Sequence, residues 1–190
     1  CMPTCFPRGF HATPAIGDVN GDGIDDIVAS SYNHHIYAWS RGGTLLFKRN
    51  HYDTIWSSPA VVDIDGDGRN EVVVGGDVHH SNPVLGGPDG GMVWVIRRTG
   101  SGYGNYPGYP KRFPGQTIWS SPAIADLNGD GNLDIVVGTG IFFPSPAGRQ
   151  VIAITARTGA NLPGWPAATQ GRVLGSPAVG DVTGDGRPEV

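Results

Sequence analysis

The nonapeptide Asp63-Ile64-Asp65-Gly66-Asp67-Gly68-Arg69-Asn70-Glu71 is the most informative part of this 190-residue sequence, because it occurs four times. The other copies cover residues 18–26, 126–134 and 181–189. Every copy has oxygen-bearing side chains at positions 1, 3, 5 and 9 and glycine at positions 4 and 6. Alternate side chains of a tight loop can point toward one centre, and Ca²⁺ takes about six to eight oxygen ligands. The spacing therefore predicts four calcium-binding loops, with the carbonyl of position 7 as a further ligand and glycines at positive φ.

The distribution of charge supports a bound cation. Of the chain's 17 acidic residues, 13 stand at positions 1, 3, 5 and 9 of the four copies, where the carboxylates repel one another unless they are neutralised. A solvated acidic turn would be an alternative for a single copy, but four copies with one spacing argue against it. Four bound Ca²⁺ ions would change the formal net charge from −4 to about +4.

The composition predicts an all-β protein. Hydrophobic residues make up 38% of the chain, and 31 glycines and 16 prolines supply turn residues rather than helix formers. The basic residues are scattered, which does not favour nucleic-acid binding, and no apolar run approaches the roughly 20 residues of a membrane span. The first residue is not Met, so the sequence is interpreted as a processed or trimmed chain.

The cysteines and the predicted calcium loops indicate a compartment. Cys1 and Cys5 are the only two cysteines. We expect a local disulfide or a bond to sequence outside this chain, with lipid modification of Cys1 as a further alternative. A disulfide and millimolar calcium both favour a secreted protein in an extracellular, cell-surface or periplasmic setting.

The repeat extends beyond the nonapeptide. A small-Pro-Ala entry precedes each copy, as in Ser58-Pro59-Ala60, and a β-branched run such as Val72-Val73-Val74 follows each complete copy. A third apolar strand, a glycine turn and a weaker fourth strand then lead to the next entry. The copies begin 45, 63 and 55 residues apart, which suits propeller blades of four short antiparallel strands.

The spacing of the units predicts an open or partial propeller. The expected divisions are an N-terminal segment with the cysteine pair (1–12), a first blade (13–57), a second (58–120), a third (121–175) and the start of a fourth (176–190). Closed propellers usually need about four to eight blades. Open edges favour either a longer polypeptide or pairing with further copies of the chain, which would build a filament if the copies joined head to tail.

The repeat pattern resembles a known family. Small-Pro-Ala-x-x-Asp-x-Asp/Asn-Gly-Asp-Gly-x-x-Asp/Glu-Ile/Val-Val is similar to the FG-GAP/VCBS repeat, itself similar to the β-propeller of integrin α subunits, and it covers almost the whole chain. The resemblance implies one Ca²⁺ per loop and a weaker fourth site, because Thr183 replaces the usual Asp or Asn. The implied ligands, with the carbonyl of position 7 included, are Asp18, Asn20, Asp22, Ile24 and Asp26; Asp63, Asp65, Asp67, Arg69 and Glu71; Asp126, Asn128, Asp130, Asn132 and Asp134; and Asp181, Thr183, Asp185, Arg187 and Glu189.

The face opposite the calcium loops is the expected binding face, because strand alternation sends the longer connections there. The tryptophans Trp56 and Trp119 recur at equivalent positions, which favours packing between units over ligand stacking. The two histidine pairs could bind a transition metal, but solvated loop residues are the favoured interpretation. The phenylalanine pair could contact a partner or belong to a tucked loop. The candidate ligand-binding residues are His34, His35, His79, His80, Phe142 and Phe143.

The sequence contains no familiar nucleophile or zinc-hydrolase motif. The acids outside the ligand positions are few, but Asp77 and Asp89 share a predicted insertion, and some polysaccharide lyases resemble this scaffold. The main hypothesis is therefore a secreted, calcium-stabilised module for cell adhesion or for carbohydrate or protein binding, in which Ca²⁺ is structural. The alternatives are an extracellular structural subunit that forms a filament and part of a polysaccharide-active lyase or hydrolase.

Overall fold

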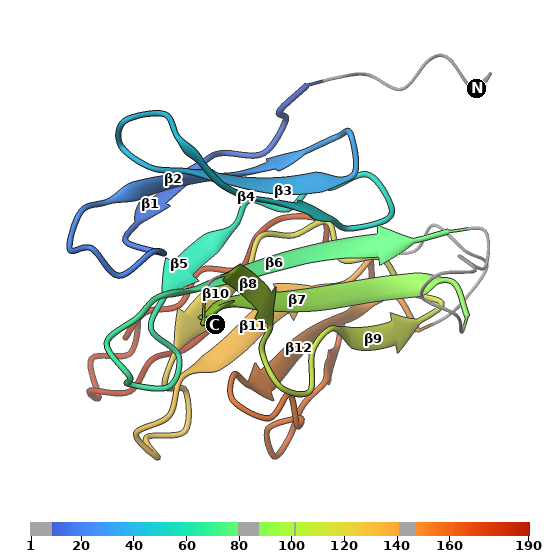
Figure 1. Cartoon of the computed structure of the whole chain (residues 1–190). Coiled ribbons are helices and arrows are strands. Elements are labelled where there is room, and N and C mark those ends of the chain that lie inside the picture. Colours follow the sequence, from blue (N-terminus) through green and yellow to red (C-terminus); the bar gives the residue numbers. More distant parts are fainter. Residues whose placement is uncertain (1–8, 80–87, 101, 141–146) are drawn as a thin grey trace.

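The computed structural model describes residues 9–79, 88–100, 102–140 and 147–190, which contain 13 β-strands and no helix. The strands form three antiparallel sheets, which lie one over the next in chain order (Figure 1). The all-β prediction is confirmed. The strands of the first sheet are β1 (Ala15–Gly17), β2 (Asp26–Ser31), β3 (His35–Trp39) and β4 (Leu45–Asn50); those of the second are β5 (Ala60–Val62), β6 (Glu71–Val78), β7 (Gly90–Thr99), β8 (Gly102–Asn105) and β9 (Lys111–Pro114); those of the third are β10 (Ala123–Ala125), β11 (Asp134–Gly138), β12 (Gln150–Thr155) and β13 (Ala167–Ala168).

The nonapeptide closes the first hairpin of every sheet in the same register. The last paired residues are Gly17 with Asp26, Val62 with Glu71, and Ala125 with Asp134. Position 9 of the nonapeptide is therefore also the first residue of the second strand. A side chain at this position is fixed by the strand ladder, while the preceding eight residues form the connecting loop.

The prediction of four strands in every unit is wrong for the second sheet, which has five. Strand β8 pairs with the end of β7, and β9 pairs with its beginning. The sequence around β8 is rich in glycine and tyrosine, and this composition predicts an insertion rather than a strand. Strand β6 also continues to Val78, so Asp77 lies in a strand rather than in the predicted insertion.

The β-branched runs fill two cores between the sheets. Successive side chains of a strand point to opposite faces, so the middle sheet can pack on both sides. Val72, Val74 and Ile96 of the second sheet face the first sheet, whereas Val73 and Val95 face the third. All five side chains are at most 1% exposed, which explains why these strands lack the alternation of polar and apolar residues expected of a half-exposed sheet.

A relay of hydrogen bonds joins the entries of successive units. The amide of Thr13 donates to Ser58 Oγ, the amide of Ser58 donates to Ser121 Oγ, and the amide of Ser121 donates to Ser176 Oγ, each over 2.9 Å. The recurring Ser or Thr before Pro-Ala therefore has a structural role. It satisfies one backbone donor of the preceding unit, and it gives neighbouring sheets a common spacing.

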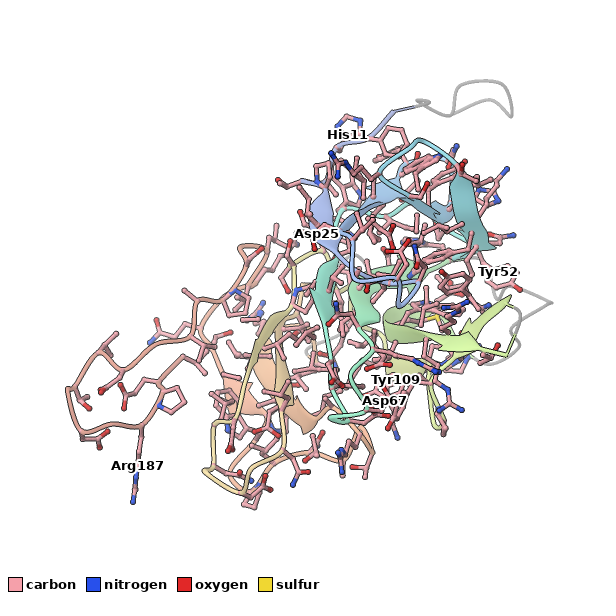
Figure 2. All side chains as sticks on the ribbon, turned by 60° about the vertical axis from the view of Figure 1, so that its left-hand side comes forward. His11, Asp25, Tyr52, Asp67, Tyr109 and Arg187 are labelled. Atoms are coloured by element: carbon pink, nitrogen blue, oxygen red, sulfur yellow. The ribbon has the colours of Figure 1, made fainter. Side chains whose placement is uncertain are left out.

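The last residues of the chain follow the third sheet without forming a sheet of their own. Residues 176–190 contain a single bridge, between Gly180 and Glu189, and the loop that carries Arg187 extends away from the three sheets (Figure 2). In the described part of the chain, no helix is long and apolar enough to cross a membrane.

Candidate functional site

The four nonapeptide loops share one backbone conformation. The glycines at positions 4 and 6 all have positive φ, between 73° and 84°. Residues with a Cβ rarely adopt this conformation, so the loop can be built only with glycine at these two positions without strain.

The carboxylate at position 1 organises each loop by accepting backbone N–H groups. In the second loop, Asp63 Oδ1 accepts from Gly66 at 2.7 Å and from Asp67 at 3.2 Å, and Oδ2 accepts from Gly68 at 2.8 Å. Burial raises the pKa of Asp63, but these amides outweigh it and hold the pKa below its usual value. The other three loops repeat the arrangement around Asp18, Asp126 and Asp181.

The carboxylate at position 9 is buried beneath the loop. Glu71 is 2% exposed and accepts the N–H of Ile64 at 3.0 Å. Burial, together with the negative charges of the nearby loop carboxylates, raises the pKa of Glu71 to about 7. Burial likewise raises the pKa of Asp26 and of Asp134 in the first and third loops. These loops therefore hold an acid where its ionised form is disfavoured, and a divalent cation would remove this cost.

The side chains of the loops fit a calcium ion. Ligand oxygens of Asp63, Asp65 and Glu71 lie within 4.8 Å of one another, and two oxygens bound to one Ca²⁺ at about 2.4 Å can be no farther apart than that. The same holds for three acids of the fourth loop, Asp181, Asp185 and Glu189. Within the described ranges, both ion pairs involve His79, so no lysine or arginine side chain neutralises the loop carboxylates.

The first and third loops have Asn at position 3. Asn20 Nδ2 lies 3.2 Å from Asp22 Oδ2, and Asn128 Nδ2 lies 3.0 Å from Asp130 Oδ2. The two ends of an amide are interchangeable by rotation of the side chain, so Oδ1 can take the same place. Both loops then offer an all-oxygen set of the kind that Ca²⁺ prefers.

Contacts from other segments and from neighbouring units also hold the nonapeptide loops, and sequence reasoning missed these contacts. Arg157 of the third unit donates to the carbonyl of Asp65 in the second loop, and within the second unit Tyr106 Oη donates to Asp65 Oδ2 at 3.1 Å. Asn70 Nδ2 of the second loop donates to the carbonyl of Asp18 in the first at 2.9 Å. An arginine precedes the glycine turn in each complete unit, and this repetition was the available signal.

Aromatic side chains gather at the opposite end of the strands. Trp56 lies 4.9 Å from Tyr32, 5.7 Å from His11 and 5.9 Å from Trp119, measured between ring centroids. We call these four residues the aromatic row. The two tryptophans do make the expected contact between units, but Trp56 remains 41% exposed. Sequence reasoning did not anticipate Tyr32 or His11, which the fold brings to the row.

A polar cluster of Asp53, Asp77 and His79 lies next to the aromatic row. His79 Nδ1 is 2.6 Å from Asp53 Oδ2, and His79 Nε2 is 3.1 Å from Asp77 Oδ2. Trp119 Nε1 donates to the other oxygen of Asp77 at 2.9 Å. Asp77 is fully buried, and this burial raises its pKa to about 6. The sequence interpretation paired Asp77 with Asp89, whereas the cluster joins it to Asp53 from the β4–β5 connection.

The remaining predicted binding residues do not belong to this three-residue cluster or lie outside the described residues. His34 and His35 lie where β2 turns into β3, and His35 Nδ1 is 2.7 Å from the carbonyl of Asn33. The predicted candidates outside the described residues are His80, Phe142 and Phe143, together with the predicted disulfide residues Cys1 and Cys5.

Comparisons with known proteins agree with the repeat structure. A solved rhamnogalacturonan lyase of Bacillus licheniformis has a similar fold, with a TM-score of 0.57 and 19% sequence identity over 95% of this chain. This chain spans 39% of the length of that protein. No curated protein matches the sequence. The family described as FG-GAP-like repeat matches residues 18–74 and 84–137, and the FG-GAP repeat matches residues 55–96. The chain therefore belongs to the FG-GAP repeat family.

Proposed function

We propose that this chain is a secreted, calcium-stabilised, β-propeller-like module that binds a carbohydrate or protein ligand, as adhesion modules do. Four loops of one geometry carry this proposal, because each gathers oxygen ligands at one end of the strands. The partly exposed aromatic row at the other end supplies the binding face. Calcium has a structural role, with one ion in each loop.

The structural role of calcium follows from the position of the loops. Each loop connects the first two strands of a unit, and in the second unit the acid at its end, Glu71, is also the first residue of the long buried strand β6. A bound cation would remove the repulsion between the loop carboxylates and fix the start of this strand. An ion that binds only the folded chain, at 100 times its dissociation constant, stabilises it by about 2.7 kcal/mol per site.

Thermal unfolding tests the role of calcium. We expect the melting temperature to fall by more than 10 °C when excess EGTA replaces 2 mM CaCl₂, because several sites are lost together. The same concentration of MgCl₂ is the control, since Mg²⁺ keeps its water shell more firmly and demands a smaller octahedral site. A melting temperature unchanged by EGTA would refute the structural role.

The aromatic row has the chemistry of a ligand platform. Tryptophan and tyrosine present large apolar faces together with a polar group, and they are enriched where proteins bind their ligands. Trp56 projects from the connection between two sheets, and its ring contacts fix its orientation. The similar fold of a rhamnogalacturonan lyase makes rhamnogalacturonan the first probe to use.

A direct binding assay tests the aromatic row. We expect immobilised rhamnogalacturonan or another acidic polysaccharide to retain the protein, and Trp56→Ala to weaken retention at least tenfold. Trp39→Ala is the matched control, because Trp39 lies in β3 and makes no ring contact with the row among the described residues. Equal retention of both variants would refute the row as the binding face, and release of shortened polysaccharide would instead favour the lyase alternative.

Self-assembly is a second candidate, and the outer face of the first sheet favours it. Ile16 and Ile27 are 67% and 43% exposed. By strand register, Ile27 corresponds to Val72 and Ile135 of the other sheets, which are 1% and 0% exposed. A further copy that packed another repeat unit on this face would bury it in the same way. Sedimentation velocity should then show species larger than the monomer that Ile27→Lys removes, and a monomer at all concentrations would refute assembly.

A further inference from the structure

We propose that Asp77 and His79, oriented by Asp53, form a site for a divalent transition metal of the Zn²⁺ or Mn²⁺ class, separate in place and in chemistry from the calcium loops. The three residues come from two parts of the chain. Asp53 belongs to the connection between β4 and β5, whereas Asp77 and His79 lie at the end of β6. Their ligand atoms lie within 4.8 Å of one another.

The two ring nitrogens of His79 give the first argument. Each faces a carboxylate oxygen, Nδ1 that of Asp53 at 2.6 Å and Nε2 that of Asp77 at 3.1 Å. A neutral imidazole carries a single N–H. The shorter contact places this proton on Nδ1, so the lone pair of Nε2 faces the carboxylate of Asp77. With this proton on Nδ1, Nε2 and the carboxylate of Asp77 favour a cation beside them, either a second ring proton or a metal ion.

The distance between these two donor atoms suits a metal ion. Zn²⁺ binds histidine nitrogen and carboxylate oxygen at about 2.0–2.2 Å. Two ligands at that distance that are 3.1 Å apart subtend an angle of roughly 95° at the metal, which is close to octahedral and within reach of tetrahedral geometry. The side chains of His79 and Asp53 are 16% and 18% exposed, so water can complete the coordination.

The surrounding hydrogen bonds have the form of an outer shell. A histidine that binds a metal commonly donates its other ring N–H to a carboxylate, and Asp53 is placed to accept it. Trp119 Nε1 holds the second oxygen of Asp77. On the inner side of the strand, the ring of the fully buried His51 occupies the space that a side chain at Gly76 would need. Both proposed ligands are therefore fixed before a metal arrives.

The donor set distinguishes this site from the calcium loops. Calcium takes oxygen ligands alone, whereas an imidazole nitrogen beside carboxylates suits zinc, manganese or iron. A metal bound to Asp77 and His79, with Asp53 hydrogen-bonded to His79, would hold the β4–β5 connection against the end of β6. Through the Trp119 contact, it would also tie the connection that leads to the third sheet.

Calorimetry with ZnCl₂ tests the proposal on the whole chain in 2 mM CaCl₂, which saturates the loops. We expect one zinc ion per chain with a dissociation constant below 10 µM. His79→Gln should weaken binding at least 100-fold, and Asp53→Asn, a change in the outer shell, about tenfold. His35→Gln is the control, because His35 lies on the same side of the sheets but outside the cluster.

Spectroscopy keeps the proposal testable if a buried variant fails to fold. Co²⁺ added to the wild-type protein should give visible absorption bands that one equivalent of Zn²⁺ removes. Ni²⁺ should quench the fluorescence of Trp119, and Trp119→Phe should lose this signal while it still binds zinc. The absence of zinc binding below 100 µM, or zinc binding unchanged in His79→Gln, would overturn the proposal and leave a proton as the cation between the two groups.

Discussion

The substitution Glu71→Gln should have opposite effects on stability with and without calcium. In the metal-free loop, burial raises the pKa of Glu71 from 4.5 to about 7. An acid whose pKa is higher in the folded than in the unfolded state stabilises the folded protein while it is protonated. This contribution is complete below the pKa of the unfolded state and is lost as the pH rises through the pKa of the folded state. The metal-free protein should therefore lose stability between pH 5 and pH 8 through this one group.

The structure sets the size of the effect. The two pKa values of Glu71 differ by about 2.5, and each pH unit corresponds to about 1.36 kcal/mol, which gives a ceiling of about 3 kcal/mol. Water screens the repulsion, because the loop glycines and Asp67 are exposed and Asp63 and Asp65 are only half-buried. We therefore expect a change of about 1–2 kcal/mol in the free energy of unfolding, or roughly 2–8 °C in melting temperature for a domain of this size.

Glutamine removes the charge and keeps an oxygen that can accept the N–H of Ile64. In EGTA at pH 8, Glu71→Gln should melt above the wild type by this amount, and at pH 5 the two proteins should melt together. In 2 mM CaCl₂ the order should reverse, because the variant has lost a charged ligand.

Urea titrations followed by circular dichroism at pH 5, 6.5 and 8 measure these differences. Glu189→Gln is the matched control, because Glu189 holds the same position in the fourth loop but is less buried and starts no long strand. If Glu71→Gln were less stable than the wild type in EGTA at pH 8, the position-9 acid would not be a repelled ligand, and the calcium interpretation of the loop would be refuted.

Three further substitutions test the structure itself, each measured as a change in urea unfolding against Gly102→Ala, which has open space and an ordinary backbone conformation. Gly68→Ala should cost about 1–2 kcal/mol, because φ is 83° and no contact interferes; a cost like that of the control would refute backbone strain. Gly76→Ala should cost about 3 kcal/mol or more, because its Cβ would collide with the ring of His51; a cost below 1 kcal/mol would contradict this packing. Ser121→Ala should cost about 1–2 kcal/mol by leaving an amide of the preceding unit without its acceptor; an unchanged stability would argue against the relay.

The repeat made the sheets and loops predictable from sequence, because the information lies within nine consecutive residues. Positions 1, 4 and 6 of the nonapeptide determine a local conformation through hydrogen bonds to Asp63 and through positive φ at glycine. The β-branched runs predict buried strands for the same local reason. Strand β8 escaped prediction because Gly102–Asn105 has no apolar pattern and forms a strand only by pairing with the polar end of β7.

The polar cluster and the aromatic row escaped sequence reasoning for a different reason. Asp53 and His79 are 26 positions apart, and their contact depends on how the connection between two sheets folds back over the end of β6. Tyr32 and Trp56 likewise come from separate connections, Tyr32 from the one after β2 and Trp56 from the one between β4 and β5. A single sequence carries no local signal for such pairs. Their residue types mark candidates, and only the arrangement of the sheets decides which of them meet.

Strand β6 places the two proposed functions at opposite ends of one rigid element. Glu71 begins the strand in a calcium loop, and Asp77, six residues later, holds both His79 and Trp119. At about 3.3 Å per residue, the two carboxylates are separated by roughly 20 Å, too far for direct electrostatic coupling in salt water. Every residue of β6 is buried, so a displacement at one end of the strand would reach the other end through packing rather than through charge. We therefore propose that calcium would act on the proposed binding face by fixing where this strand starts, a structural role without contact to the ligand.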